Sequence, residues 1–303
     1  MKRLLLLSIV LVGLVVVHEA KPQAQRTADA ARAGSSSTSA APQRVVSLVP
    51  ATTEMLFAIG AGNRVVGVGT YDRYPPAVEK LPRLGGLLDP DIEQLIALRP
   101  DLVVVYDTQT ELRRQLDRAH IPAWSYSIME LADVTTTMKS LGDRVGLAAR
   151  ATAAASAIDT ELRDVRNRVA GRGRPKSLLL FGREAGSLRG INASGGYGFL
   201  HDLLELAGGA DVLSDVKKAS VAMSSEMVLA RAPEAIIELH YGEPWPSARL
   251  DAERRVWTAL PSVPAVRTNR IYLVTGDEFV VPGPRVTIAA ERLARLLHPD
   301  AFR

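Results

Sequence analysis

The side chains that most often perform catalysis do not form a recognisable centre in this sequence. The histidines lie far apart, and none belongs to an HExxH pair that would hold a metal ion. They are His18, His120, His201, His240 and His298. No serine stands in a GxSxG motif, and the absence of cysteine excludes disulfides, thiolate metal sites and cysteine nucleophiles. We therefore expect a protein that is not an enzyme and that has no resident cofactor or metal.

Two glutamates occupy matching places in two similar stretches of the sequence. Glu93 begins Glu-Gln-Leu-Ile-Ala-Leu-Arg-Pro, and Glu226 begins Glu-Met-Val-Leu-Ala-Arg-Ala-Pro, each followed by an apolar strand. Each glutamate alone has a structural explanation, because the helix dipole stabilises an acid in the first turn of a helix by about 0.3–1 kcal/mol. A matched pair of acids also offers two separated anchors for the basic residues of a two-fold symmetric partner.

Four aromatic residues each come just after a predicted strand. They are Tyr71, Tyr106, Phe181 and Phe279. Ligands of open α/β sheets bind outside the carboxyl ends of the strands, so these rings could face a bound ligand. Each ring taken alone is equally compatible with packing inside a loop. The glycine-rich stretch 190–198 lacks the GxxxxGK[ST] and GxGxxG patterns, which favours a flexible or ligand-facing loop over a phosphate-binding one.

Helices and continuous apolar strands alternate along residues 44–303, which is typical of parallel sheets covered on both faces. The repeat around Glu93 and Glu226 indicates two copies of one α/β unit. We predict two doubly wound α/β lobes, residues 44–130 and 172–303, with a ligand cleft between them. Residues 131–171 would form the long, rigid helix that joins the lobes, either unbroken or as two helices.

The first 43 residues do not resemble the rest of the chain. Residues 1–20 have the basic start, the apolar run and the small final residue of a cleavable signal peptide. Residues 21–43 contain almost no large apolar side chain and should form a disordered tether. With no cysteine to carry a lipid, we expect a soluble protein exported to the periplasm. The net charge of +4 comes largely from these two segments, so nucleic acid is not an expected partner.

Several segments carry a resemblance to a known family. They are Val49-Pro-Ala-Thr-Thr-Glu-Met-Leu-Phe-Ala-Ile-Gly, Tyr71-Asp-Arg-Tyr-Pro-Pro, Asp91-Ile-Glu-Gln-Leu-Ile-Ala-Leu-Arg-Pro and Ser225-Glu-Met-Val-Leu-Ala-Arg-Ala-Pro. They resemble the periplasmic binding proteins of ABC importers for vitamin B12, haem and ferric siderophores. The resemblance implies a monomer with little hinge closure, and it places Glu93 and Glu226 where the family docks onto arginines of a permease dimer.

The vitamin B12-binding branch is the one that the sequence resembles most. The resemblance places corrin contacts at seven positions, namely Tyr71, Leu87, Tyr106, Phe181, Ser220, Asp277 and Phe279. Leu87, Ser220 and Tyr106 stand where the best-known member has tryptophan, which leaves room for a different flat ligand. The expected function is capture of a corrinoid, cobalamin (vitamin B12), for delivery to an ABC permease. The alternatives are haem or a ferric siderophore as the ligand, or an exported metal-dependent hydrolase on a similar scaffold.

Overall fold

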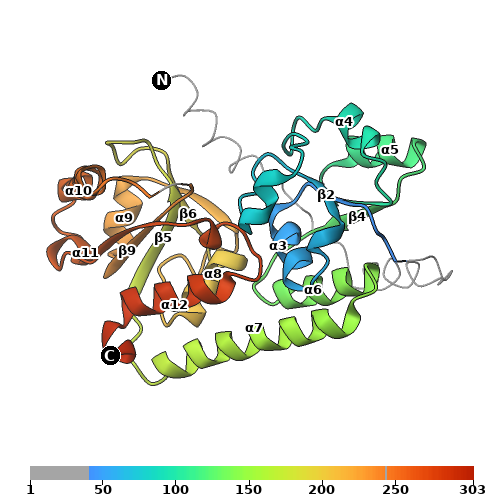
Figure 1. Ribbon diagram of the computed structural model, residues 1–303. Coiled ribbons are helices and arrows are strands. Elements are labelled where there is room, and N and C mark those ends of the chain that lie inside the picture. Colours follow the sequence, from blue (N-terminus) through green and yellow to red (C-terminus); the bar gives the residue numbers. More distant parts are fainter. Residues whose placement is uncertain (1–40, 243) are drawn as a thin grey trace. The chain divides into compact units, whose positions relative to one another are not determined.

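The computed structural model describes residues 41–242 and 244–303 (Figure 1). The predicted signal peptide, residues 1–20, and all but the last few residues of the predicted tether, residues 21–43, lie outside the described residues. From residue 42 onward the chain forms one compact unit. No helix in its described part combines the length and the apolarity needed to cross a membrane.

The first sheet contains four parallel strands in the order β2-β1-β3-β4. The strands are β1 (Val45–Ser47), β2 (Val65–Val68), β3 (Leu102–Tyr106) and β4 (Ala123–Tyr126). The chain winds outward from β1 to β2 in one direction and from β1 through β3 to β4 in the other. This reversal confirms the doubly wound arrangement predicted for the first lobe, and it places a topological switch point between β1 and β3. Such a point is where open α/β sheets bind ligands.

The second sheet has the order β10-β9-β5-β6-β8, with the short strand β7 paired to β5. Its strands are β5 (Lys176–Gly182), β6 (Ile191–Ser194), β7 (Ala210–Asp211), β8 (Ser220–Met223), β9 (Ala235–His240) and β10 (Ile271–Thr275). Strands β10, β9, β5 and β7 are parallel, whereas β6 is antiparallel to both of its neighbours. The expected loop over 190–198 is therefore wrong for residues 191–194, because Ile191 and Ala193 are buried and draw this segment into the sheet.

The helices alternate with the strands as the sequence predicts. They are α3 (Pro50–Ala58), α4 (Ile92–Ala97), α5 (Thr110–Arg118), α6 (Asp133–Arg144), α7 (Ala148–Val169), α8 (Phe199–Leu206), α9 (Ser225–Arg231), α10 (Ser247–Val256), α11 (Pro264–Arg267) and α12 (Val286–Leu297). Short 3-10 helices are η1 (Gly62–Arg64), η2 (Pro76–Lys80), η3 (Trp257–Ala259), η4 (Asp277–Phe279) and η5 (Pro299–Phe302). We call the first sheet with α3, α4 and α5 the N-terminal lobe, and the second sheet with α8 to α12 the C-terminal lobe.

Two helices, α6 and α7, occupy the segment between the lobes. Gly146 lies in the turn between them with φ of +69°, a conformation that favours glycine. Gly142 lets the two helices approach closely, because a Cβ atom at this position would lie 2.1 Å from the Cβ of Ala151. The sequence allowed one helix or two here, and these glycines explain why there are two.

Helix α7 lies along both α6 and α12 (Figure 1), and it packs through one apolar face. Its buried residues recur every three or four positions, the period of a single helical face. They are Ala151, Ala155, Ile158, Leu162, Val165 and Val169. The helix contacts α6 at one end and α8 and α12 of the C-terminal lobe along its length. One hydrophobic cluster therefore runs from Val45 and Met55 in the N-terminal lobe, through α7, to Leu293 in α12.

Candidate functional site

Three of the residues predicted to contact a ligand come together near the switch point of the first sheet. Gln109 joins two of them: its Oε1 accepts a hydrogen bond from the backbone amide of Tyr106 at 3.0 Å, and its Nε2 donates to the carbonyl of Leu87 at 3.0 Å. The ring of Tyr71 lies against Gly86, the residue before Leu87. A Cβ atom added to Gly86 would be 3.2 Å from this ring. Tyr71, Leu87 and Tyr106 thus form one group, which we call the N-lobe ligand group.

Tyr106 is the last residue of β3, and its ring packs edge-on against the ring of Tyr126, with centroids 5.8 Å apart. Burial raises the pKa of Tyr106, and the nearby Asp72 and Tyr241 raise it further. The phenol therefore stays neutral at physiological pH and can donate a hydrogen bond.

Asp72 is a buried acid beside this group. It is 1% exposed, and neither of its carboxylate oxygens has a hydrogen-bond partner among the described residues, although the hydroxyl of Thr53 lies near. Burial raises the pKa of Asp72 to about 7, and the charge of Arg83 offsets only part of this effect. A carboxyl group with such a pKa changes its charge near neutral pH.

The predicted contact residues of the C-terminal lobe lie at strand ends. Phe181 is next to last in β5 and packs against the shared core, and Ser220 begins β8, paired with Ser194. Asp277 opens η4 after β10, and its Oδ1 accepts a hydrogen bond from the backbone amide of Gly242 at 3.2 Å. Each of these three side chains is only partly buried.

Phe279 does not fit the prediction of a ligand-facing ring. It is fully buried within the shared core, and the guanidinium of Arg292 lies 4.8 Å from the centroid of its ring. The pattern of an aromatic after a strand selected it, but the η4 turn directs this apolar ring into the interior. The structure therefore gives Phe279 a packing role.

Tyr241 was missed by the sequence analysis, although it also follows a strand, β9. Its hydroxyl donates to the carbonyl of Tyr71 at 3.4 Å, and the guanidinium of Arg73 lies 5.3 Å from the centroid of its ring. These contacts join a loop of the C-terminal lobe to the loop of the N-terminal lobe that carries the N-lobe ligand group. The strand-end rule that selected Tyr106 would also have selected Tyr241.

A second contact between the lobes is ionic. Arg285 donates to Glu54 on α3 through Nε at 3.0 Å and through Nη2 at 2.5 Å. The side chain of Glu54 is 3% exposed, so this pair is largely removed from water. The guanidinium also lies 4.4 Å from the centroid of the Tyr74 ring. The structure thus engages Arg285 with one residue from each of two segments of the N-terminal lobe.

Glu93 and Glu226 are exposed and stand in equivalent places. Each lies in the first turn of a short helix whose N-cap side chain accepts a backbone hydrogen bond: Asp91 from Gln94 at 2.9 Å, and Ser224 from Met227 at 3.3 Å. The Ser224 hydroxyl lowers the pKa of Glu226. Both side chains are therefore accessible to another protein.

The structural repeat continues beyond these helices. Shortly after each helix comes a residue with φ of +47°, Arg99 in one lobe and Ala232 in the other, and a proline follows it. The next residue is acidic in both lobes. Asp101 accepts a hydrogen bond from the backbone amide of Arg44, and Glu234 accepts one from that of Lys176. The two α/β units thus share the helix, the turn after it and the acidic residue that bonds to the backbone near the start of a strand.

Comparison with known proteins decides the family. The family model described as periplasmic binding protein matches residues 45–278, which is most of the chain. The chain belongs to the periplasmic binding protein family. Members of this family deliver substrates to ABC transporters outside the cytoplasm and are not catalysts, so the metal-dependent hydrolase considered from the sequence is dropped.

Individual relatives agree with this assignment. An ABC transporter substrate-binding lipoprotein of Bacillus subtilis is 26% identical over 86% of this chain and 82% of that protein. The vitamin B12-binding protein of Salmonella typhimurium is 29% identical over 84% of this chain and 90% of that protein. The periplasmic haem-binding protein of Roseiflexus has the same fold, with a TM-score of 0.71 at 24% identity over 86% of this chain and 99% of that one.

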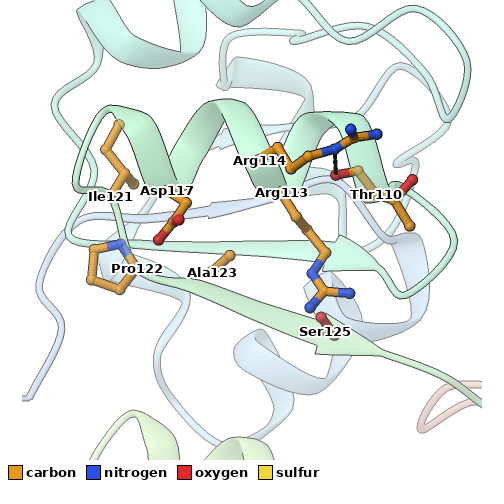
Figure 2. A pocket seen from close by; sticks show the side chains of 8 residues that line it. All are labelled: Thr110, Arg113, Arg114, Asp117, Ile121, Pro122, Ala123 and Ser125. Carbon is orange, nitrogen blue, oxygen red and sulfur yellow. Dashed lines mark hydrogen bonds between the residues drawn. The ribbon is translucent and has the colours of Figure 1, made fainter.

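A pocket of about 550 Å³ lies elsewhere, on the edge of the first sheet between α5 and β4 (Figure 2). Figure 2 shows the side chain of Arg113 extending from α5 toward Ser125 on β4. None of the residues with a predicted role in ligand contact or docking lines this pocket.

Proposed function

We propose that the protein captures a corrinoid, cobalamin in the first instance, outside the cytoplasm and delivers it to the permease of an ABC importer. The observation that carries the proposal is the N-lobe ligand group, which combines two tyrosine rings and an aliphatic side chain at the switch point of the first sheet. A corrin has a broad apolar face, and its burial would contribute about 25 cal/mol per Å² before the ordering costs of binding. The likeness to a vitamin B12-binding protein supports the same ligand.

In this proposal the C-terminal lobe completes the site. Phe181 and Ser220 would contact the corrin, and Asp277 would accept hydrogen bonds from amide groups at its periphery. Tyr241 would join them, since it already contacts the loop of Tyr71. A ligand entering between the lobes would exchange some of these contacts for its own.

Delivery would depend on the two exposed glutamates. Glu93 and Glu226 would pair with arginines on the two halves of a permease dimer, with a single copy of the binding protein on each dimer. Residues 1–20 would serve as the export signal and residues 21–43 as a tether to the two lobes.

Haem or a ferric siderophore is the second candidate ligand. Leu87 and Ser220 are smaller than the tryptophans expected at these places in the vitamin B12-binding branch, and they leave room for a different flat ligand. Haem shares with the corrin a wide apolar surface, so the same rings could hold it.

Calorimetry distinguishes between these candidate ligands. The purified protein is titrated with cyanocobalamin, with haem and with a ferric siderophore under the same conditions. Tight binding of one cobalamin per chain, with weaker binding of the other two, is the expected result. Tight binding of haem or the siderophore without cobalamin binding would overturn the corrinoid proposal and leave the role in transport.

A further inference from the structure

Two exposed aliphatic side chains accompany the docking glutamates. Ile96 lies three residues after Glu93 on α4 and is 42% exposed, and Leu229 lies three residues after Glu226 on α9 and is 41% exposed. Residues three apart share one face of a helix. Single exposed aliphatic residues are ordinary on protein surfaces. The same residue class, with the same exposure, at the same place in both lobes is a more specific pattern.

Helices α4 and α9 each turn the same face toward the interior of their lobe. The residue just before Ile96 and the residue just before Leu229 fix this orientation. Leu95 and Val228 are both fully buried, and this anchors one face of each helix in its lobe. The next residue is consequently turned outward, together with the glutamate one turn earlier. Each lobe therefore presents one acid and one aliphatic side chain side by side, and we call these the two acid–aliphatic pairs.

Another exposed aliphatic residue shows that this pairing is not general. Ile288 on α12 is 50% exposed, but the residue three positions earlier is Arg285, which is held by Glu54. Ile288 therefore has no acid one turn before it, and the acid one turn after it, Glu291, is paired with Arg295. It also has no counterpart in the other lobe. It provides a matched control for the two acid–aliphatic pairs.

We infer that Ile96 and Leu229 are apolar anchors of the contact with the permease, each seated beside the basic residue that pairs with the adjacent glutamate. The inference rests on the docking role proposed for Glu93 and Glu226. The partner is accordingly a two-fold symmetric surface that presents, on each half, a basic side chain next to an apolar pocket. The charges steer and orient the encounter, and the buried aliphatic groups slow dissociation.

The test measures binding to the cognate permease–ATPase complex in lipid nanodiscs by surface plasmon resonance at several salt concentrations. The variants are Ile96→Ala, Leu229→Ala and the double variant, with Ile288→Ala as the control; alanine preserves helix propensity. We expect each single variant to bind roughly tenfold more weakly, mainly through faster dissociation, and to keep the salt dependence of the natural protein. The control should bind as the natural protein does.

A further pair of variants separates this inference from the docking proposal. Glu93→Gln with Glu226→Gln should weaken binding and flatten its salt dependence, because the steering charges are gone. If these variants behave so while Ile96→Ala and Leu229→Ala match the Ile288→Ala control, the apolar anchors are disproved and the docking role stands. If neither the glutamate nor the aliphatic variants alter binding, the docking surface itself is wrong.

Discussion

Glu54 and Arg285 lie far apart in the sequence and form a buried, bidentate ion pair between the lobes. The carboxylate accepts from Nε at 3.0 Å and from Nη2 at 2.5 Å, and Glu278 lies 3.6 Å from Nη1 of the same guanidinium. Burial raises the pKa of Glu54, and Arg285 offsets part of that rise. Separating the lobes at this point would break this bidentate ion pair, which opposes movement between them.

Removal of the arginine should therefore destabilise the protein strongly. Arg285→Met leaves Glu54 buried without its partner, and we expect a loss of about 3–5 kcal/mol in the free energy of unfolding. Denaturant unfolding measures this loss. The exposed pair of Arg295 with Glu291 is the control, because Arg295→Met should cost at most about 1 kcal/mol. Equal effects of the two variants would show that the buried pair does not hold the lobes together.

Asp72 should make stability depend on pH. Its pKa is about 7 in the folded protein and 3.8 for an ordinary aspartate, so between these values the folded state keeps a proton that the unfolded state has released. Stability should accordingly fall as the pH rises from about 4 to about 7, and level off above that. Asp72→Asn removes the charge and should be more stable than the natural protein by roughly 1–3 kcal/mol at pH 8.

Thermal or denaturant unfolding at several values between pH 4 and pH 8 measures this dependence of stability on pH. The control is Asp164→Asn, because Asp164 is exposed on α7 and the variant should keep the pH profile of the natural protein. A profile for Asp72→Asn that still falls between pH 4 and 7 would assign the dependence to another group.

Gly142 should tolerate no side chain, although alanine ordinarily stabilises a helix over glycine by about 0.5–1 kcal/mol. In Gly142→Ala the new Cβ would lie 2.1 Å from the Cβ of Ala151, so α6 and α7 must move apart. We expect a destabilisation of about 1–3 kcal/mol in denaturant unfolding. Gly173→Ala is the control, since nothing lies within 4 Å of its Cβ position and it should be close to neutral. A stabilised Gly142→Ala variant would contradict the close approach.

The internal repeat explains how much of the fold the sequence could predict. Glu93 with Pro100, and Glu226 with Pro233, mark a local pattern of helix, break and strand, and the structure has this pattern in both lobes. Contacts between distant residues leave no such pattern. The bond from Gln109 to Leu87 depends on how two loops meet, and periodicity within either loop cannot indicate it.

Residues near chain turns show the same limit. Tyr106 ends a strand and Phe279 comes shortly after one, but a short 3-10 turn directs Phe279 into the core. Glu54 is an acid next to the apolar run Met55 to Ala58 of α3, and a buried acid needs a partner. Naming that partner required the three-dimensional fold.

Gln109 should act on ligand binding by positioning Tyr106 and Leu87. Gln109→Leu removes both hydrogen bonds but keeps a side chain of similar size, so we expect roughly tenfold weaker binding of cyanocobalamin in calorimetry. Gln109→Glu retains an acceptor for the Tyr106 amide and should recover part of the affinity. Gln115→Leu on α5 is the control, because the side chain of Gln115 donates a hydrogen bond to the exposed Glu111 and none to the N-lobe ligand group. Unchanged binding by Gln109→Leu would remove Leu87 and Tyr106 from the site.

Reversal of both docking charges should separate transport from ligand binding. In the double variant Glu93→Lys and Glu226→Lys, each lobe would present a positive charge to the basic residues of the permease, and like charges across an interface cost several kcal/mol. Both side chains are exposed and take no part in the hydrogen bonds that join the N-lobe ligand group, so calorimetric binding of the ligand should be unchanged. Uptake of labelled cobalamin into cells that depend on this protein should be lost. Glu111→Lys, an exposed acid on α5, should transport normally. Loss of ligand binding in the double variant would instead mean that the two glutamates maintain the structure of the lobes.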